Sequence, residues 1–438
     1  MVTHRPPDDF ASAKSLFSEF DTSVAGLRVA IYSHDTMGLG HKRRNLLIAQ
    51  SLVQAVPGCS VLLVTGMVEA NAEDLPEGID YLALPAWTKT VDGQYQARRL
   101  DLSLTELALL RGKIIRAAME TFNPDVFIVD NVPRGALREL DPVLKFLHRY
   151  RHTRCVLGLR DVLDEPSVVR RQWQQADNET AIRQYFDAIW VYGDPTVYDL
   201  VSAYRLPADI AAKVHYAGYL DARQRLVTSE LAGVLTHTDQ PLALCLVGGG
   251  QDGEALATAF THTALPQGWR GILIAGPLMP KVVRQRLHQQ VALCPNLSVL
   301  NYCPEPVRLI WQAQAVIAMG GYNTTCEVLS LGVRSLIAPR VKPRREQWIR
   351  AQQLQRLGLV DLLPPHRVCP EALTDWLRAV ASQDKSELNP KAQELVNMRG
   401  LDRLPLLLTN LIAEKETQRL LEPYQRLIRV YEQARKAG

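Results

Sequence analysis

The feature that most constrains this chain is a repeated alternation of short apolar runs with amphipathic segments of helical length. In the first half, the apolar runs are residues 27–32, 61–64, 79–84, 126–129, 155–159 and 189–192. Each run has the length of a strand and is mostly apolar, as expected of a parallel strand that helices cover on both faces. The alternation therefore predicts stacked βαβ units and parallel sheets.

The alternation stops in a polar stretch between Leu220 and Gln240 and then restarts. Because a chain of 438 residues is long for a single hydrophobic core, we interpret this stretch as a domain boundary. Apolar positions from Leu404 to Leu411 recur at helical spacing, which predicts a helical end to the chain. We expect an α/β protein of two Rossmann-like domains, arranged as an N-terminal arm (1–24), a first domain (25–225), a second domain (240–385) and a C-terminal helical segment (386–438).

Composition excludes several classes of function. The 50 basic and 46 acidic residues leave a net charge of +4, too small for a general nucleic-acid binder. The seven cysteines are scattered and form no C-x-x-C pair or zinc-like spacing, so we expect reduced thiols and no metal site. No secretory signal or membrane-spanning run occurs. These features predict a cytoplasmic protein whose only membrane contact would be peripheral.

The first candidate site follows the run 27–32. Gly38 and Gly40 allow a tight turn and close approach of a ligand at the carboxyl edge of the predicted sheet. Position 43 is an arginine, so the dinucleotide pattern G-x-G-x-x-G is absent. His41 stands at the predicted helix start, where it can act as a general base, and Arg44 follows on that helix. The alternative is a capping or merely exposed histidine.

Two further glycine-rich loops follow strands of the second series. Gly249, Gly250 and Gln251 lead into a helix, whose backbone amides and positive dipole suit a diphosphate, although a plain glycine-rich turn would look the same. After the run 316–318, Gly321 precedes polar side chains that can cap a helix and also bind a phosphate, namely Asn323, Thr324 and Thr325.

Two sets of charged and polar residues complete the second candidate site. Glu327 lies one helical turn beyond the third loop, where its carboxylate could accept bonds from ribose hydroxyls, unless it is an ordinary surface acid. A basic loop with Lys342, Arg344 and Arg345 follows the run 335–338, and it could balance phosphate charge or simply be solvated. Glu346 and Gln347 come next, at a helix start, where they could bind sugar hydroxyls.

Four segments, in their order along the chain, resemble the MurG-like glycosyltransferases of the GT-B superfamily. They are Gly-Leu-Gly-His (38–41), Gly-Gly-Gly-Gln (248–251), Gly-Gly-Tyr-Asn-Thr-Thr-Cys-Glu (320–327) and Arg-Glu-Gln (345–347). The resemblance runs from about residue 27 to residue 363. It implies a nucleotide diphosphate sugar, UDP-linked, on the second domain, with Glu327 on the ribose, Gln347 on the sugar, and Thr324 and the amides after Gly249 on the diphosphate. It also implies an acceptor near His41 and no metal or other cofactor.

The first loop departs from this family. Gly-Leu-Gly-His-Lys-Arg-Arg is closer to the G-x-G-H-x-x-R stretch of nucleotide-sugar hydrolases of the SpsG and PseG type. Asp130, after the run 126–129, matches the position of their second polar site residue. We expect a metal-independent glycosyltransferase with His41 and Asp130 as catalytic residues and a sugar, lipid-linked or small-molecule hydroxyl acceptor. The alternatives are a hydrolase or epimerase of the same fold, and a non-catalytic nucleotide-sugar-binding protein.

Overall fold

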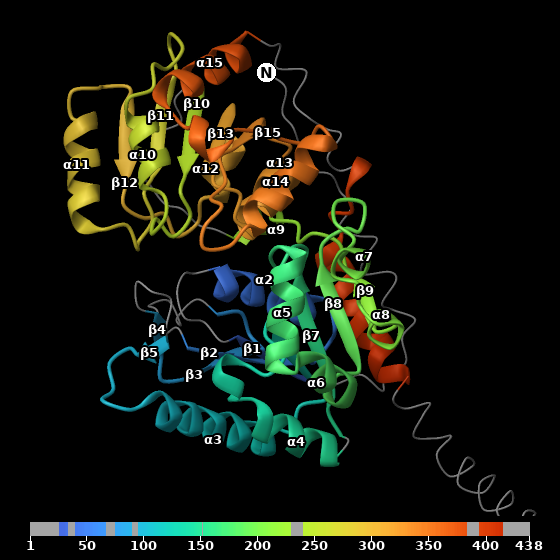
Figure 1. Cartoon of the computed structure of the whole chain (residues 1–438). Coiled ribbons are helices and arrows are strands. Elements are labelled where there is room, and N and C mark those ends of the chain that lie inside the picture. Colours follow the sequence, from blue (N-terminus) through green and yellow to red (C-terminus); the bar gives the residue numbers. More distant parts are fainter. Residues whose placement is uncertain are drawn as a thin grey trace, which may run out of the picture.

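The structure is a computed structural model, and it describes residues 26–33, 40–66, 75–89, 95–150, 152–228, 240–382 and 394–414. The expected arm (1–24), Gly38 and the end of the expected helical segment (415–438) lie outside the described residues. Two α/β domains, each built on a parallel sheet, lie one above the other (Figure 1). The predicted fold class is therefore confirmed.

The first sheet has seven strands in the order β3-β2-β1-β6-β7-β8-β9, and all neighbouring pairs are parallel. Chain order reverses between β1 and β6, the switch point at which open α/β sheets bind ligands beyond their carboxyl ends. The strands are β1 (Arg28–Ser33), β2 (Ser60–Thr65), β3 (Ile79–Ala83), β6 (Val126–Asp130), β7 (Arg154–Arg160), β8 (Ala188–Tyr192) and β9 (Val214–Tyr216).

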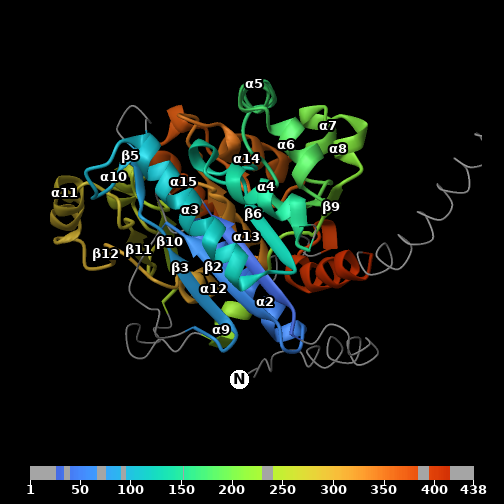
Figure 2. The same cartoon turned by 90° about the horizontal axis from the view of Figure 1, so that it is seen from below.

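Helices cover both faces of this sheet because successive strand residues turn apolar side chains to opposite sides. Ile115 of α3 and Leu144 of α4 pack on one face, and Ile48 of α2 packs on the other. Figure 2 shows α3 and α4 crossing the sheet in the view from below. The elements are α2 (Gly40–Ala55), α3 (Leu104–Phe122), η3 (Ala136–Arg138), α4 (Asp141–Tyr150), α5 (Pro166–Ala176), α6 (Asn178–Tyr185), α7 (Leu200–Tyr204) and α8 (Ala208–Ala211).

The stretch between β3 and α3 contains a small antiparallel pair, β4 (Trp87–Lys89) with β5 (Tyr95–Ala97), which the sequence patterns did not predict. Trp87 is fully buried and lies under the guanidinium of Arg111, 5.3 Å from it. Arg111 in turn donates to both carboxylate oxygens of Glu139, all within the protein interior. A buried aromatic ring and a buried ion pair thus fix this hairpin to α3.

The second sheet repeats the same plan with six parallel strands in the order β12-β11-β10-β13-β14-β15. Its switch point lies between β10 and β13. The elements are α9 (Gln224–Thr228), β10 (Leu242–Leu246), α10 (Glu254–Thr261), β11 (Arg270–Ile274), α11 (Lys281–Val291), β12 (Leu297–Leu300), α12 (Val307–Gln312), β13 (Ala315–Ala318), α13 (Tyr322–Leu331), β14 (Ser335–Ile337), α14 (Glu346–Arg356), β15 (Asp361–Leu362), η4 (Pro365–Arg367) and α15 (Pro370–Ala381).

The end of the described chain crosses back from the second domain to the first. Residues 400–414 are helical and lie beside β8 and β9 (Figure 1). Leu404 and Leu408 are fully buried in a cluster that also contains Leu52 of α2. The Ser51 hydroxyl donates to the Leu401 carbonyl oxygen at 2.5 Å, and residue 220 pairs with Arg399 in an isolated bridge. The described helical part of the C-terminal segment therefore packs on the first domain.

Candidate active site

The two switch points face each other across the domain interface. Helix α2, the first described element after β1, begins at Gly40, and α13 begins at Tyr322, after Gly320 and Gly321. The Asn323 side-chain amide donates to the Gly40 carbonyl oxygen at 3.0 Å. Asn323 therefore connects the start of α13 to the start of α2. The expected capping role is wrong for this residue, because the N-cap of α13 is Gly321 and no side chain caps it.

His41, Arg44 and Asp130 form a compact cluster at the first switch point. The Nδ1 atom of His41 lies 2.7 Å from Oδ2 of Asp130, which ends β6. Arg44, one turn further along α2, places Nη2 at 2.6 Å from both oxygens of Asp130. Asp130 is fully buried and Arg44 nearly so, while the His41 side chain keeps 19% of its surface exposed. Of the three, His41 is the one that a substrate can reach.

The surroundings of Asp130 keep its carboxyl group ionised. Burial alone would raise the pKa of its carboxyl group, but the positive charge of Arg44 and the contacts with His41 hold that pKa well below its ordinary value. Asp130 is therefore ionised and can only accept hydrogen bonds. The guanidinium of Arg44, 2.8 Å from Nδ1 of His41, can only donate. Nδ1 of His41 therefore lies near an acceptor, Asp130, and a donor, Arg44, and Nε2 presents a lone pair when Nδ1 carries the proton that Asp130 accepts.

Tyr322 connects this cluster to the second domain. Two guanidinium groups lie over its ring, that of Arg44 at 5.5 Å and that of Arg350 at 5.7 Å from the ring centroid. The ring of Tyr219 stacks near it with centroids 6.2 Å apart. Cations over aromatic faces are attracted by the ring quadrupole, most strongly where water is excluded. The contact between the domains is thus an ordered stack of aromatic rings and arginines.

The loop after β7 holds the two domains together. Asp161 accepts bonds from Nε and Nη2 of Arg350 at 2.7 and 2.6 Å, and both side chains are buried. The Tyr219 hydroxyl donates to the same carboxylate at 2.7 Å. The backbone N–H of Arg345 donates to Asp164 at 2.9 Å, across the same interface. This bidentate, buried ion pair makes Asp161 and Arg350 the principal polar connection between β7 and α14.

Sequence reasoning did not single out this loop. The segment Arg-Asp-Val-Leu-Asp-Glu (160–165) follows a predicted strand, 155–159, and therefore lies at the same sheet edge as Asp130. Charged residues directly after a buried strand were the signal available in the sequence. Their partners, on α14 nearly two hundred positions later, could not be identified from spacing.

The glycine loops of the second domain have two distinct roles. Gly250 has φ +90°, and a Cβ there would lie 2.2 Å from the Ala275 carbonyl oxygen, so only glycine fits. Gly320 has φ +74°, and a Cβ added there would lie 2.6 Å from the Ile337 side chain. At Gly248 and Gly321, by contrast, nothing lies within 4 Å of an added Cβ. The loops before α10 and α13 therefore each leave open space beside one glycine, where a bound diphosphate could lie.

Glu327 is buried with 2% exposure, inside α13, and does not lie on the surface. Its Oε1 accepts a bond from Nη1 of Arg225 at 2.8 Å, and Arg225 also pairs with Glu305. Thr325 is buried as well. Glu327 thus already shares a hydrogen bond with an arginine of α9, the helix at the start of the domain connection.

The start of α14 is arranged around Arg340. Its guanidinium donates to Oε1 of Glu346 at 2.9 Å, and its backbone N–H donates to Oε1 of Gln347 at 3.1 Å. Arg345 lies outside this group, since it pairs with Glu165 of the first domain at 3.0 Å. The predicted donor-side residues therefore separate into the pair Glu346 and Gln347, fixed by Arg340, and Arg345 at the domain interface.

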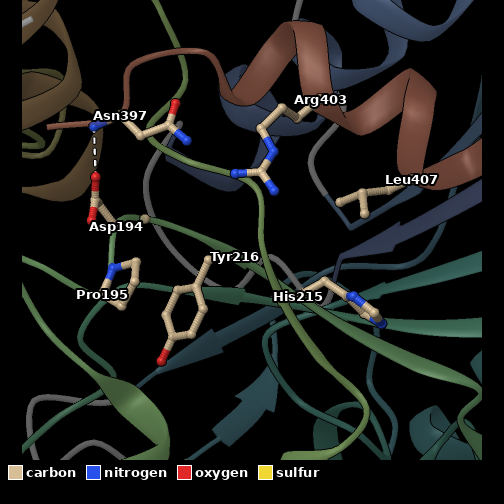
Figure 3. A pocket seen from close by; sticks show the side chains of 8 residues that line it. Asp194, Pro195, His215, Tyr216, Asn397, Arg403 and Leu407 are labelled. Carbon is tan, nitrogen blue, oxygen red and sulfur yellow. Dashed lines mark hydrogen bonds between the residues drawn. The ribbon is translucent and has the colours of Figure 1, made fainter.

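Other candidate features lie elsewhere or are absent from the described parts of the chain. A cavity of about 440 Å³ lies between the end of the first sheet and the returning C-terminal segment, where Asp194 accepts from the backbone N–H of Asn397 (Figure 3). This cavity lies where the C-terminal segment packs on the first domain, and His41, Arg44 and Asp130 do not line it. Within the described ranges, no group of three His, Cys, Asp or Glu side chains could hold a metal, and no helix is long and apolar enough to cross a membrane.

Comparison with known proteins places this site in context. Residues 244–402 match the model of the glycosyltransferase family 28 C-terminal domain, a region that covers the second domain and the start of the C-terminal helical segment. A UDP-N-acetylglucosamine–N-acetylmuramyl-(pentapeptide) pyrophosphoryl-undecaprenol N-acetylglucosamine transferase of Histophilus somni is 23% identical over 164 residues, which are 37% of this chain and 45% of that protein. The matched region thus spans less than half of that relative. The expected resemblance to MurG-like glycosyltransferases is confirmed.

Solved structures show the same fold over nearly the whole chain. The glycotransferase of kitacinnamycin superposes with a TM-score of 0.60 at 17% identity, over 89% of this chain and 99% of that one. MurG of Acinetobacter baumannii superposes with a TM-score of 0.53 at 15% identity, over 88% of this chain and 99% of that one. A protein from Listeria monocytogenes, described as a putative UDP-N-acetylglucosamine 2-epimerase, superposes with a TM-score of 0.59 at 13% identity, over 90% of this chain and 98% of that one. At these identities the likeness establishes the fold alone.

Proposed function

We propose that this chain, with its glycosyltransferase family 28 C-terminal domain, transfers a glycosyl group from a nucleotide diphosphate sugar to a hydroxyl acceptor. One observation carries the proposal. The His41–Asp130 pair lies at the first switch point, and the start of α13, with open space beside Gly321, lies across the interface from it. A base and a diphosphate-binding surface are the two parts that glycosyl transfer from such a donor needs.

In this proposal His41 removes the proton from the acceptor hydroxyl through Nε2. Asp130 holds the imidazole in the required tautomer and stabilises the positive charge that forms on it. Arg44 keeps Asp130 ionised and does not itself touch the acceptor. As the bond to the leaving diphosphate breaks, negative charge grows where the backbone amides at the starts of α10 and α13 are directed.

We assign the donor to the second domain, UDP-linked, with the ribose near Glu327, the diphosphate on Gly249, Gly250, Gln251, Gly321, Thr324 and Thr325, and the sugar near Glu346 and Gln347. The relative from Histophilus somni uses a UDP-linked sugar and a lipid-linked acceptor by name, which supports this choice. The acceptor, whether a sugar, a lipid-linked group or a small molecule, lies near His41. A lipid-linked acceptor would bring the protein into peripheral contact with the cytoplasmic face of a membrane.

A second candidate is hydrolysis or epimerisation of the same donor. A His–Asp pair can activate water as readily as an acceptor hydroxyl, and one structure of the same fold is described as a 2-epimerase. The third candidate, a non-catalytic nucleotide-sugar binder, would retain the second-domain loops and show no turnover.

A two-stage experiment tests these functions. Thermal unfolding is measured with UDP, GDP, dTDP and ADP and their sugars, because a ligand well above its Kd raises the stability of the fold. The sugar nucleotide that stabilises most is then incubated with and without hydroxyl acceptors, and products are separated by mass spectrometry. Transfer predicts glycosylated product only when acceptor is present. Release of free sugar at full rate without acceptor would instead establish the hydrolase.

A further inference from the structure

The cavity of Figure 3 lies between the first sheet and the C-terminal segment that returns to it. Its volume of about 440 Å³ is within the size range of small-molecule sites. Three parts of the chain form its wall, namely the turn after β8, strand β9 and the C-terminal helix of residues 400–414 with the turn before it. The turn after β8 lies at the carboxyl edge of the first sheet, where open α/β folds bind ligands.

Three side chains in the lining carry hydrogen-bond donors without a partner. Arg403 is exposed on the C-terminal helix, and His215 is exposed on β9. No hydrogen bond or ion pair among the described residues includes either side chain, and the acid next to Arg403, Asp402, pairs with Arg399. The half-buried Asn397 uses only its Oδ1, which accepts from the Arg399 backbone N–H at 2.9 Å. In the view of Figure 3, Arg403 extends from its helix between Asn397 and His215.

The side-chain acceptors in the lining, by contrast, are already used. Asp194 is buried, and its Oδ1 accepts from the backbone N–H and the hydroxyl of Thr196 at 2.8 and 2.7 Å. Its Oδ2 accepts from the backbone N–H of Asn397 at 2.6 Å. The Tyr216 hydroxyl donates to Asp199 at 2.9 Å, so this group is committed as well. Free donors therefore outnumber free acceptors in the lining, as expected of a site for an anion.

Close backbone packing fixes the position of Asn397 in this wall. Gly218 has φ +96°, and a Cβ there would lie 2.8 Å from the backbone and side-chain oxygens of Asn397, so no larger residue fits. The Asn397 carbonyl oxygen accepts from the backbone N–H of Tyr219 at 2.8 Å. The backbone N–H of Gly400 donates to the Tyr219 carbonyl oxygen at 2.9 Å. The turn that carries Asn397 is thus bound to the first domain from both sides.

The same turn connects the cavity to the domain interface. The ring of Tyr219 stacks near that of Tyr322, and the Tyr219 hydroxyl donates to Asp161. A ligand bound to Asn397 and Arg403 would therefore hold the segment that positions Tyr219. Its binding is expected to stabilise the docking of the C-terminal helix on the first domain.

We propose that this cavity binds a soluble phosphate monoester, with its phosphate on Arg403, His215 and the side-chain amide of Asn397, and its organic part against Tyr216 and Leu407. An arginine donates two parallel hydrogen bonds to phosphate oxygens, and the imidazole and the amide each add a donor. A phosphate monoester suits this set better than a carboxylate, because it carries more negative charge and three acceptor oxygens. The inference goes beyond the proposed reaction and does not depend on it.

Calorimetric titration of the full chain tests the binding. The probe is glycerol 3-phosphate, with glycerol as the uncharged control and succinate as the carboxylate control. The wild type should bind glycerol 3-phosphate and show little binding of glycerol. Arg403→Met should weaken this binding roughly tenfold or more, the range for loss of a charge-assisted hydrogen bond, and His215→Val should weaken it less. Arg171→Met, at an exposed arginine of α5, is the matched control and should not change it.

Hydrogen exchange followed by mass spectrometry locates the bound probe. Glycerol 3-phosphate should slow the exchange of backbone amides within residues 215–219 and 394–407 of the wild type, and it should not do so in Arg403→Met. Protection confined to the glycine loops at 248–253 and 320–325 would place the phosphate in the proposed donor site and overturn the proposal.

Thermal unfolding separates this role from a structural one. Because Arg403 and His215 are exposed and have no partner among the described residues, both variants should keep the Tm of the ligand-free wild type. His215→Val carries the test by itself if Arg403→Met fails to fold. Equal affinity of the wild type and the folded variants for the probe, no binding to the wild type, or tighter binding of succinate overturns the proposal. None of these measurements requires turnover, so the proposed function can fail independently.

Discussion

The Nδ1 atom of His41 lies 2.7 Å from Oδ2 of Asp130, although the two residues are 89 positions apart in the chain. The parallel pairing of β1 with β6 produces this contact, since it aligns Ser33 with Asp130 at one sheet edge and α2 starts above that edge. The buried Asp130 carboxylate can orient the accessible imidazole by accepting a hydrogen bond from Nδ1.

If His41 is the general base, His41→Ala should lower kcat by roughly 10²- to 10⁴-fold, because proton removal in the transition state is lost. Donor affinity should stay within a factor of about two, since the proposed donor contacts lie on the second domain. Steady-state kinetics and calorimetric titration with the donor measure both. His262→Ala, an exposed histidine of the second domain, serves as the control. A raised acceptor KM with unchanged kcat would assign His41 to acceptor binding instead.

Asp130→Asn should destabilise the protein by about 3–5 kcal/mol at neutral pH, because it leaves the buried Arg44 guanidinium without its counter-charge. The folded-state pKa of Asp130 is depressed, so the stabilisation from its charge is present above the unfolded-state pKa of about 4 and is lost as pH falls through the folded-state value. Urea unfolding from pH 7 to pH 3 should therefore show the difference between wild type and variant shrinking below about pH 4. A constant difference over that range would mean that Asp130 has the same pKa in the folded and the unfolded protein, and would contradict the depressed folded-state pKa.

Arg350→Met should lower the free energy of unfolding by about 3–5 kcal/mol, since Asp161 would remain buried without its cation. Arg356→Met, on the same helix but exposed, should change it by less than about 0.5 kcal/mol. Denaturant titration followed by fluorescence and circular dichroism measures both variants. Similar stabilities for the two would show that the Asp161–Arg350 pair does not hold the domains together.

Glu327→Gln should weaken binding of a nucleoside diphosphate by roughly tenfold if Glu327 accepts bonds from the ribose hydroxyls, because the amide is a weaker acceptor than the carboxylate. Glu305→Gln is the control, since it removes the other carboxylate partner of Arg225 and leaves Glu327 in place. Calorimetry with UDP and with UMP compares the variants. Unchanged UDP affinity in Glu327→Gln would refute the ribose assignment and leave Glu327 as the structural partner of Arg225.

Chelation should leave turnover intact. Within the described ranges no cluster of acidic, histidine or cysteine side chains could hold a divalent ion, and the proposed chemistry stabilises the leaving diphosphate with backbone amides. Initial rates are measured after dialysis against EDTA and after re-addition of magnesium or manganese. A strict requirement for either ion in the chemical step would contradict the proposal.

The local sequence already determined the central strands of both sheets, the glycine loops and the position of His41 near a helix start, because hydrophobic period and turn chemistry depend on neighbouring residues; the short strands β4, β5, β9 and β15 were missed. It could not determine that Asn323 bonds to Gly40 instead of capping its own helix, or that Glu327 pairs with Arg225. Those contacts join distant parts of the chain, and many partners compete for each polar group.

The tertiary structure alone decided which charges are matched. From the sequence, Arg160, Arg344 and Arg350 are three equivalent cations near predicted strands or loops. Only the pairing of β7 with its neighbours and the docking of α14 on the first domain give Arg350 a buried carboxylate and leave Arg160 without one. Burial and counter-ions are properties of packing between domains, and a one-dimensional pattern does not contain them.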